Sequence, residues 1–445
     1  MKEQKQDETS RAAPVAGAIP PQQAAEARDR WNWVEPTVWT ERMLTRLEAS
    51  EPTTVWFRLW DKVIEGRSLQ AAFWAVWRNQ GAPGVDGQTV EQFDEQARPE
   101  LARLSEELRQ GNYRRQPARR KWIPKPGTTE KRPLGIPAVR DRVVEAALRN
   151  VLEPIFELDF AESSHGFRHD RGCRTAVAQV EKWLRSGRVW CVDADLKSYF
   201  DTIPHEKLMA LVRQRIVDGS VLKLLEQCLK AGVLDELKGW EPTERGTPQG
   251  AVISPLLANL YLNPLDHEME QKGWALVRYA DDFVVLCQTK EEAEAVMAYL
   301  RQWTEAAGLT LHPTKTRIVN AAEEGFDFLG WHFRARTKWP RKKSVQKLRE
   351  KLRPLSQRKQ GRSLGEMVAR LNPILRGWYG YFRESHPHDL QGADGWLRRR
   401  LRAMLRKREK RPGYGLSEAD SRQWPNRWFA GQGLFSLEHG SCTYG

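Results

Sequence analysis

Two short segments place carboxylates where they could hold a cation. Leu276–Leu286 consists of two apolar runs around a tight polar centre, which predicts a β-hairpin with Asp281 and Asp282 at its turn. Upstream, a second alternating segment puts Asp193 and Asp195 on one face of a strand. The hairpin alone is typical of an ordinary Asp-rich turn. Two acidic strands together indicate a cation site, because neighbouring carboxylates repel one another unless a cation holds them.

Basic and glycine-containing segments accompany these strands. One segment with eight Lys and Arg residues and one acidic residue predicts a strand pair from which Lys125 and Arg132 project, although alone it is typical of a solvated basic hairpin. Asn79–Gly87, with three glycines and a proline, predicts a loop that turns sharply or approaches a ligand. Gly246–Gly250 lets the backbone approach a ligand, and Gln249 offers both a hydrogen-bond donor and an acceptor.

The positive charge is concentrated in one block. The 445-residue chain has a formal net charge of +14 and a pI of about 9.6. Arg341–Arg411 holds 22 Lys and Arg against 6 Asp and Glu, a net of +16, so the remainder carries 14 − 16 = −2. This block predicts three amphipathic helices, whose basic faces suit a phosphate backbone unless they are simply solvated. In the third helix, leucines face inward and four arginines are expected outside: Arg399, Arg402, Arg406 and Arg408.

Other features bound the class of protein. The length predicts several domains. The five cysteines form no C-x-x-C pair, which favours reduced thiols in a cytoplasmic protein. No signal peptide and no apolar run long enough to cross a bilayer is present, so no membrane partner is expected.

The remaining patterns predict individual elements. Residues 1–35 are expected to be a flexible leader. His165, in a loop that precedes a helix, is more typical of a structural residue than of a ligand. Further helices are expected at Thr89–Gln110, Asp141–Glu157, Thr175–Leu184, Ser254–Leu262 and Glu291–Ala307, and a strand pair at Phe326–Phe333.

Taken in order, these segments together with Lys315-Thr316 and Arg376–Phe382 resemble the bacterial group II intron-encoded reverse transcriptase/maturase, from about residue 36 to the end. The resemblance implies an α+β fold, a right-hand polymerase (fingers and palm) with a helical N-terminal extension and a helical basic thumb. The implied domains are a leader (1–35), an N-terminal extension (36–110), fingers and palm (111–335), a thumb or maturase segment (336–390) and a basic C-terminal nucleic-acid-binding region (391–445).

The resemblance also implies roles for residues. Asp195, Asp281 and Asp282 would be catalytic ligands of two Mg²⁺ ions. Asp193 shares the face, but the family pattern points to Asp195. Lys315 would protonate the leaving pyrophosphate, and Phe200, five positions after Asp195, would be a steric gate against the ribose 2′-hydroxyl. The nucleotide-binding set is Lys125, Arg132, Phe200 and Gln249, and the primer or template set is Tyr279, Gly250 and Arg168.

The expected function is RNA-directed DNA synthesis for a group II intron, with help in splicing and mobility. The expected partners are the parent intron RNA, an RNA template with a DNA primer, target DNA and dNTPs. Two alternatives are a non-catalytic RNA-binding splicing factor, which the intact aspartates disfavour, and a reverse transcriptase recruited to host defence or repair. Because no cysteine-paired segment follows the basic helices, no DNA endonuclease is expected.

Overall fold

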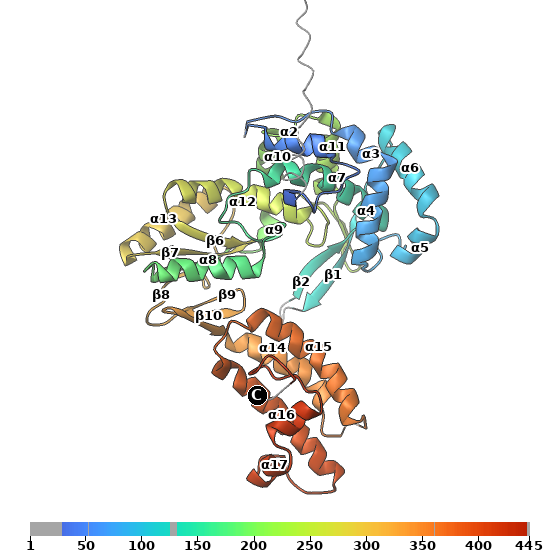
Figure 1. The fold of residues 1–445 in the computed structure, drawn as a ribbon. Helices are drawn as coiled ribbons and strands as arrows, with labels where there is room; N and C mark the ends of the chain where they lie inside the picture. Colours follow the sequence, from blue (N-terminus) through green and yellow to red (C-terminus); the bar gives the residue numbers. More distant parts are fainter. Residues whose placement is uncertain (1–28, 52, 125–130, 360, 443–445) are drawn as a thin grey trace, which may run out of the picture. The chain divides into compact units, whose positions relative to one another are not determined.

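A computed structural model describes residues 29–51, 53–124, 131–359 and 361–442. These residues form two compact units that interleave in the sequence (Figure 1). The first comprises Met1–Phe160 and Ile203–Tyr261, and the second comprises Ala161–Thr202 and Leu262–Gly445. Most of the expected leader, residues 1–28, lies outside the described residues, and the linear domain boundaries stay a prediction.

The first unit is built mainly of helices, among which α7 (Val139–Glu157) has apolar side chains that are buried almost throughout. Its other helices are α2 (Glu41–Glu48), α3 (Trp60–Ile64), α4 (Gly66–Asn79), α5 (Val90–Glu95), α6 (Ala97–Arg109), α10 (His205–Arg213), α11 (Gly219–Lys230) and the first part of α12 (Ser254–Gln271).

The single helix expected over Thr89–Gln110 is wrong, because the chain breaks there into α5 and α6. Gln96 leaves the helical region, with φ −122°. Pro99 in the first turn of α6 explains the break, since a proline cannot donate to the preceding turn and its ring clashes with the carbonyl four residues before.

A four-stranded sheet of order β2-β1-β4-β5 completes the first unit. Its strands are β1 (Ala118–Pro124), β2 (Lys131–Ile136), β4 (Val233–Asp235) and β5 (Gly239–Glu241). The expected basic strand pair is confirmed as the antiparallel β1–β2 hairpin, in which Ile123 lies opposite Arg132. Lys125, at the tip, lies outside the described residues.

The second unit contains an antiparallel sheet of order β6-β7-β3-β8. The strands are β6 (Ala275–Tyr279), β7 (Asp282–Cys287), β3 (Trp190–Asp195) and β8 (Arg317–Asn320). Helix α8 (Cys173–Arg185) packs on the face of this sheet that carries Cys191, Val277 and Val284, and α13 (Lys290–Ala306) contacts β3, β7 and β8. The short helix α9 (Tyr199–Thr202) follows β3. The two expected acidic strands are therefore neighbours in one sheet.

Beyond this sheet the chain forms a small sheet and a helical bundle. The pair expected at Phe326–Phe333 is extended by a third strand, giving β9 (Phe326–Phe328), β10 (Trp331–Arg334) and β11 (Thr337–Pro340). The bundle consists of α14 (Lys342–Leu352), the 3-10 turn η1 (Pro354–Ser356), α15 (Leu364–Phe382), α16 (Pro387–Arg408), α17 (Glu418–Gln423) and α18 (Asn426–Gly431).

The inward leucines expected in the basic block are confirmed. Leu348, Leu371, Leu397 and Leu401 are buried in one apolar cluster, with Leu405 partly buried against it. The five cysteines are free. Among the described residues, no helix is both long enough and apolar enough to span a bilayer.

Candidate active site

Strand register brings the carboxylates to one end of the β6-β7-β3-β8 sheet. Asp195, the last residue of β3, lies directly opposite Asp282, the first residue of β7. Ala280 and Asp281 form the two-residue turn between β6 and β7, and Ala280 has φ 58°, as a tight hairpin turn of this kind requires. Asp193 lies one pleat further along β3, opposite Val284.

Burial, together with repulsion from neighbouring carboxylates, raises the pKa values of Asp282, Asp281 and Asp193. Burial, with repulsion from Asp193, Asp281 and Asp195, raises the pKa of Asp282 to about 7. Burial also raises the pKa of Asp281, and it raises the pKa of Asp193 to about 6. A nearby cation stabilises the charged form of such a carboxyl group, because it offsets the repulsion that favours protonation.

The donor set fits a hard divalent cation, which takes carboxylate oxygens and keeps water and phosphate ligands. The side chains are not drawn together into a ligand cage, since no group of three or more His, Cys, Asp or Glu residues in the described part of the chain stands close enough to hold an ion. A bound ion therefore needs further oxygen donors besides these carboxylates. This is the usual arrangement for Mg²⁺ at phosphate-transfer sites.

Lys315 supplies one positive charge at this site. Its Nζ lies 2.7 Å from Oδ2 of Asp195. The loop that carries Lys315 is held to the end of β3, because the backbone N–H of His312 donates to the Asp195 carbonyl at 2.7 Å. The fold thus brings Lys315 and Asp195 together, although 120 positions separate them in the sequence.

A buried ion pair, missed by the sequence analysis, supports the turn. Arg278 and Asp266 have fully buried side chains, and Nε of Arg278 donates to Oδ1 of Asp266 at 2.7 Å. Arg278 also donates to the carbonyl of Ala280 at 3.0 Å and to the hydroxyl of Ser164 at 2.7 Å. An arginine inside an apolar strand indicates that a buried acidic partner exists. The sequence does not show which of the three acidic residues of α12 is that partner.

The loop before α8 packs directly on the turn. A Cβ at Gly166 would lie 2.4 Å from the backbone nitrogen of Ala280, so only glycine allows this contact. The His165 backbone N–H donates to the Arg278 carbonyl at 2.8 Å, and its ring Nδ1 lies 2.9 Å from the Thr175 hydroxyl. Burial and neighbouring arginines lower the pKa of His165 to about 4. The expectation that His165 is structural agrees with these contacts.

Arg168, expected in the primer or template set, is buried in the loop before α8, and its contact with primer or template stays a prediction. Its guanidinium is buried and donates to the carbonyls of Ala161 and Ser164 at 2.6 and 2.9 Å. The short loop curls back on itself, and its carbonyls need donors because they are shielded from water.

Aromatic side chains stand beside the carboxylates. Phe200 is half-buried in α9, with its ring centroid 6.4 Å from that of Phe167, and Phe167 is equally far from Tyr279. Phe167 is exposed and has φ 58°. Burial and the neighbouring Cys173 raise the pKa of Tyr279 to about 12, so its hydroxyl keeps its proton at neutral pH.

The other expected nucleotide-binding residues belong to the first unit. Arg132 is exposed on β2. The Gln249 carbonyl accepts from the Gly135 N–H at 2.7 Å, which fastens this turn to β2. Gly250 has φ 106°, and a Cβ there would lie 2.5 Å from the Gly135 oxygen. Position 250 therefore requires glycine for backbone reasons alone.

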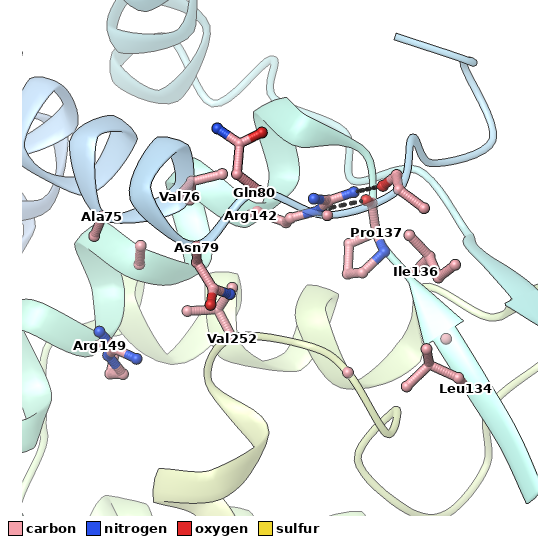
Figure 2. A pocket seen from close by; sticks show the side chains of 15 residues that line it. Ala75, Val76, Asn79, Gln80, Leu134, Ile136, Pro137, Arg142, Arg149 and Val252 are labelled. Carbon is pink, nitrogen blue, oxygen red and sulfur yellow. Dashed lines mark hydrogen bonds between the residues drawn. The ribbon is translucent and has the colours of Figure 1, made fainter. Parts of the chain in front are cut away.

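The same unit contains a pocket of about 490 Å³ between the end of α4, the strand β2, the helix α7 and the Gly250 turn (Figure 2). Arg142 of α7 connects two walls of the pocket, because it donates to the carbonyls of Pro137 and Ala82 (Figure 2). The Asn79–Gly87 loop, expected to turn sharply or to approach a ligand, begins at this pocket.

Comparison with known proteins identifies the family. Residues 123–333 match the reverse transcriptase (RNA-dependent DNA polymerase) family, and residues 345–424 match the group II intron maturase-specific domain. The chain is 36% identical over 332 residues to protein YkfC of Escherichia coli (strain K12), a match that covers 65% of this chain and 86% of YkfC. It is 34% identical over 235 residues to group II intron-encoded protein LtrA of Lactococcus lactis subsp. cremoris, covering 52% of this chain but only 38% of LtrA.

The chain belongs to the group II intron-encoded reverse transcriptases and maturases. By family it is an RNA-directed DNA polymerase that uses divalent metal ions and works with RNA, and its maturase domain adds roles in intron splicing and mobility. Among solved structures, apo telomerase from Candida tropicalis superposes with a TM-score of 0.44 and 12% identity, over 70% of this chain and 57% of that chain.

The maturase domain corrects the expected arginine surface on α16. Arg399 and Arg408 are exposed, as expected. Arg402 is buried, and its guanidinium donates to the Trp424 carbonyl and the Asn426 side chain, both at 2.9 Å. Arg406 is largely buried and pairs with Asp420. The expectation of four free arginines is therefore wrong for these last two, because the segment after α16 folds back over that side of the helix.

Proposed function

We propose that this reverse transcriptase copies RNA into DNA by nucleotidyl transfer at Asp195, Asp281 and Asp282, with two Mg²⁺ ions as cofactors. The proposal rests on one observation, the β3–β7 register that sets Asp195 opposite Asp282 beside the Asp281 turn. The burial and mutual repulsion that raise the pKa values of Asp281 and Asp282 support it, because they create a demand for positive charge.

The reaction joins the primer 3′-oxygen to the α-phosphorus of a dNTP, breaks the bond to the pyrophosphate oxygen and releases the proton of the 3′-hydroxyl to water. When bound, two divalent ions stabilise the charge on the attacking and leaving oxygens. The carboxylates hold and orient these ions. Lys315, whose ammonium already lies at the cluster, gives its proton to the leaving pyrophosphate.

Four residues are assigned to the incoming dNTP. Lys125 and Arg132 grip its triphosphate, and Gln249 lies against the nucleotide. Phe200 closes the space beside the 2′-carbon and thereby selects deoxynucleotides. The exposure of Arg132 and the position of Phe200 in α9, the short helix that follows β3, support these roles.

The nucleic-acid partners are an RNA template with a DNA primer, the parent intron RNA and target DNA. Tyr279 and Gly250 lie near the primer and template. The exposed Arg399 and Arg408 contribute to backbone binding within the block of net charge +16. Such binding weakens steeply with salt because it releases counterions.

Primer extension on an RNA template with dNTPs and Mg²⁺ tests the proposal. Asp281→Asn should lower the rate at least about a thousandfold, because metal-held charge stabilisation is worth several kcal/mol and each ~1.4 kcal/mol is tenfold. Asp193→Asn is the matched control, since Asp193 is also an aspartate and lies on the same face of β3 as Asp195. It should stay within about tenfold of wild type. Retention of most of the activity by folded Asp281→Asn would exclude the metal assignment.

A further inference from the structure

A second pocket, of about 720 Å³, lies within the C-terminal bundle. One wall is α16, and the other is formed by the segment that runs from Gly415 through α17 to the start of α18. The pocket shares no residue with the carboxylate cluster, and its size is that of a site for a small ligand or one unit of a polymer.

The lining of this pocket is positively charged. It includes Arg399, Arg402 and Arg427 and no acidic side chain. Arg402 is fixed by Trp424 and Asn426 and so serves as part of the wall. Arg399 and Arg427 are exposed, and neither has an ion pair or hydrogen bond from its side chain to any described residue. Two such guanidinium groups at one recess repel each other unless an anion lies between them.

Two glycines on α16 leave room in the same pocket. Gly392 and Gly395 are three residues apart and therefore share a face of the helix. Each costs the helix roughly 0.5–1 kcal/mol relative to alanine. Packing does not require them, because a Cβ added at either position meets nothing within 4 Å. The free space on this helix face thus belongs to the pocket and not to the core.

Trp396 adds an apolar surface to the arginines and glycines. It lines the pocket, and the guanidinium groups of Arg349 and Arg400 lie over its ring at 5.8 and 5.1 Å from the centroid. Guanidinium forks match phosphate oxygens, whereas a flat apolar wall beside them suits a sugar or a base. A free phosphate would use only the first of these features.

We propose that this pocket holds one nucleotide of a single-stranded nucleic acid, with its phosphate between Arg399 and Arg427 and its sugar and base against the Gly392–Gly395 face beside Trp396. The inference deepens the proposed function, since it rests on the maturase domain working on nucleic acid. It assigns Arg427 and the two glycines a role that the sequence pattern did not reveal.

The test measures binding of the full chain to a short mixed-sequence single-stranded RNA, and to DNA of the same sequence, across a salt titration. The Gly392→Ala/Gly395→Ala protein should bind about tenfold more weakly, as one lost base or sugar contact implies, with an unchanged salt slope. Its helix should be more stable, which circular dichroism and thermal unfolding will show. Gly365→Ala in α15 is the matched control, because its added Cβ also meets open space but lies outside the pocket. It should bind as wild type does.

Charge is tested separately with Arg399→Gln/Arg427→Gln, which should lower the salt slope by about 0.7, the value for one phosphate of a single strand. The Gly392→Ala/Gly395→Ala protein should extend a saturating primer–template at the wild-type rate. A wild-type protein without extension activity would contradict the proposed polymerase function and leave the pocket result intact. Unchanged binding of both strands by the glycine variant would overturn the pocket assignment, whereas weaker binding of RNA alone would support it with the intron RNA as the source of the nucleotide.

Discussion

The β3–β7 carboxylate site and the basic helix α16 both concentrate one sign of charge, but they compensate it differently. At the carboxylate site the like charges lie on adjacent strands, and the nearest positive side chain is Lys315 at Asp195. On α16 part of the positive charge is neutralised by acidic side chains of the bundle, because Arg398 pairs with Asp394 and Arg406 with Asp420. Residue type therefore indicates function at the first site, whereas on α16 each arginine must be assigned separately.

The two sites also differ in their support. The carboxylate turn rests on a buried ion pair, Arg278–Asp266, and Arg278 also donates to the Ala280 carbonyl in the turn and to the Ser164 hydroxyl in the adjoining loop. Arg402 and Arg406 of α16 rest on backbone carbonyls and single side chains of the segment that follows. Removal of one partner should accordingly cost more at the first site than at the second.

The largest effect is expected from Arg278→Met. Asp266 would be left buried without its partner, which costs about 3–5 kcal/mol of stability. The Ala280 carbonyl would also lose its donor, so the turn that carries Asp281 should shift and primer extension should fall. Chemical unfolding and extension kinetics measure the two losses.

The double variant Arg278→Met/Asp266→Leu separates support from stability. Replacement of a buried pair by apolar residues is often neutral for stability, so unfolding should recover. Activity should stay low, because methionine cannot donate to the Ala280 carbonyl. If activity recovers together with stability, the pair only stabilises the fold and does not position the turn.

A smaller effect is expected at Phe200. Phe200→Ala should open the space beside the 2′-carbon and raise the ratio of ribonucleotide to deoxynucleotide incorporation roughly 10- to 100-fold, the range for one steric contact in a pocket. Phe167→Ala is the control, since Phe167 is an aromatic neighbour of Phe200 but is not the residue assigned to the gate. An unchanged ratio in Phe200→Ala would mean that Phe200 only packs.

The contrast between the two regions also explains what the sequence could predict. Strand alternation and the hairpin turn were visible locally, so the positions of Asp195, Asp281 and Asp282 followed from pattern and resemblance. The Arg278–Asp266 pair and the Gly166 contact depend on which distant segments meet, which no local pattern contains. The break at Pro99 was visible in the sequence, but helix periodicity outweighed it.

On α16 the same limit had the opposite consequence. Periodicity correctly placed Leu397 and Leu401 inward. It could not show that residues 412–426 cover a second side of the helix, because their short helices have weak periodicity. Arg402 and Arg406 find partners 6 to 24 positions later, and these partners turned expected surface arginines into structural ones.

Two arginines of the same helix sharpen this distinction. Arg406→Gln removes the partner of Asp420, which is buried, and should cost about 1–3 kcal/mol of stability. Arg408→Gln removes the same charge from an exposed position and should change stability by about 0.5 kcal/mol or less. Thermal unfolding of both variants measures the two losses of stability. Equal losses would mean that the Asp420 contact contributes no more than the exposed charge.

The smallest effect concerns pH and the loop beside the carboxylate turn. The pKa of His165 is lowered to about 4 in the folded protein, whereas an unfolded histidine titrates near 6.5. Since the folded-state pKa is the lower one, the stabilising contribution of neutral His165 is present above about pH 6.5 and is lost as pH falls toward 4. The groups that face it include Arg168, Arg171, Arg278 and Glu162, and the three arginines outweigh the one carboxylate.

His165→Asn tests this argument, because asparagine keeps a polar group near the Thr175 hydroxyl but does not titrate. The difference in unfolding temperature between wild type and His165→Asn should be largest above pH 7 and should shrink as the pH falls below 6.5. In that range the unfolded wild-type chain binds a proton at His165 that the folded protein does not bind, whereas asparagine binds none. His388→Asn, at an exposed position of α16, is the control and should show no such trend. A pH-independent difference would show that His165 contributes through its hydrogen bond and packing alone, and the loop would then be as insensitive to acid as the arginine contacts of α16.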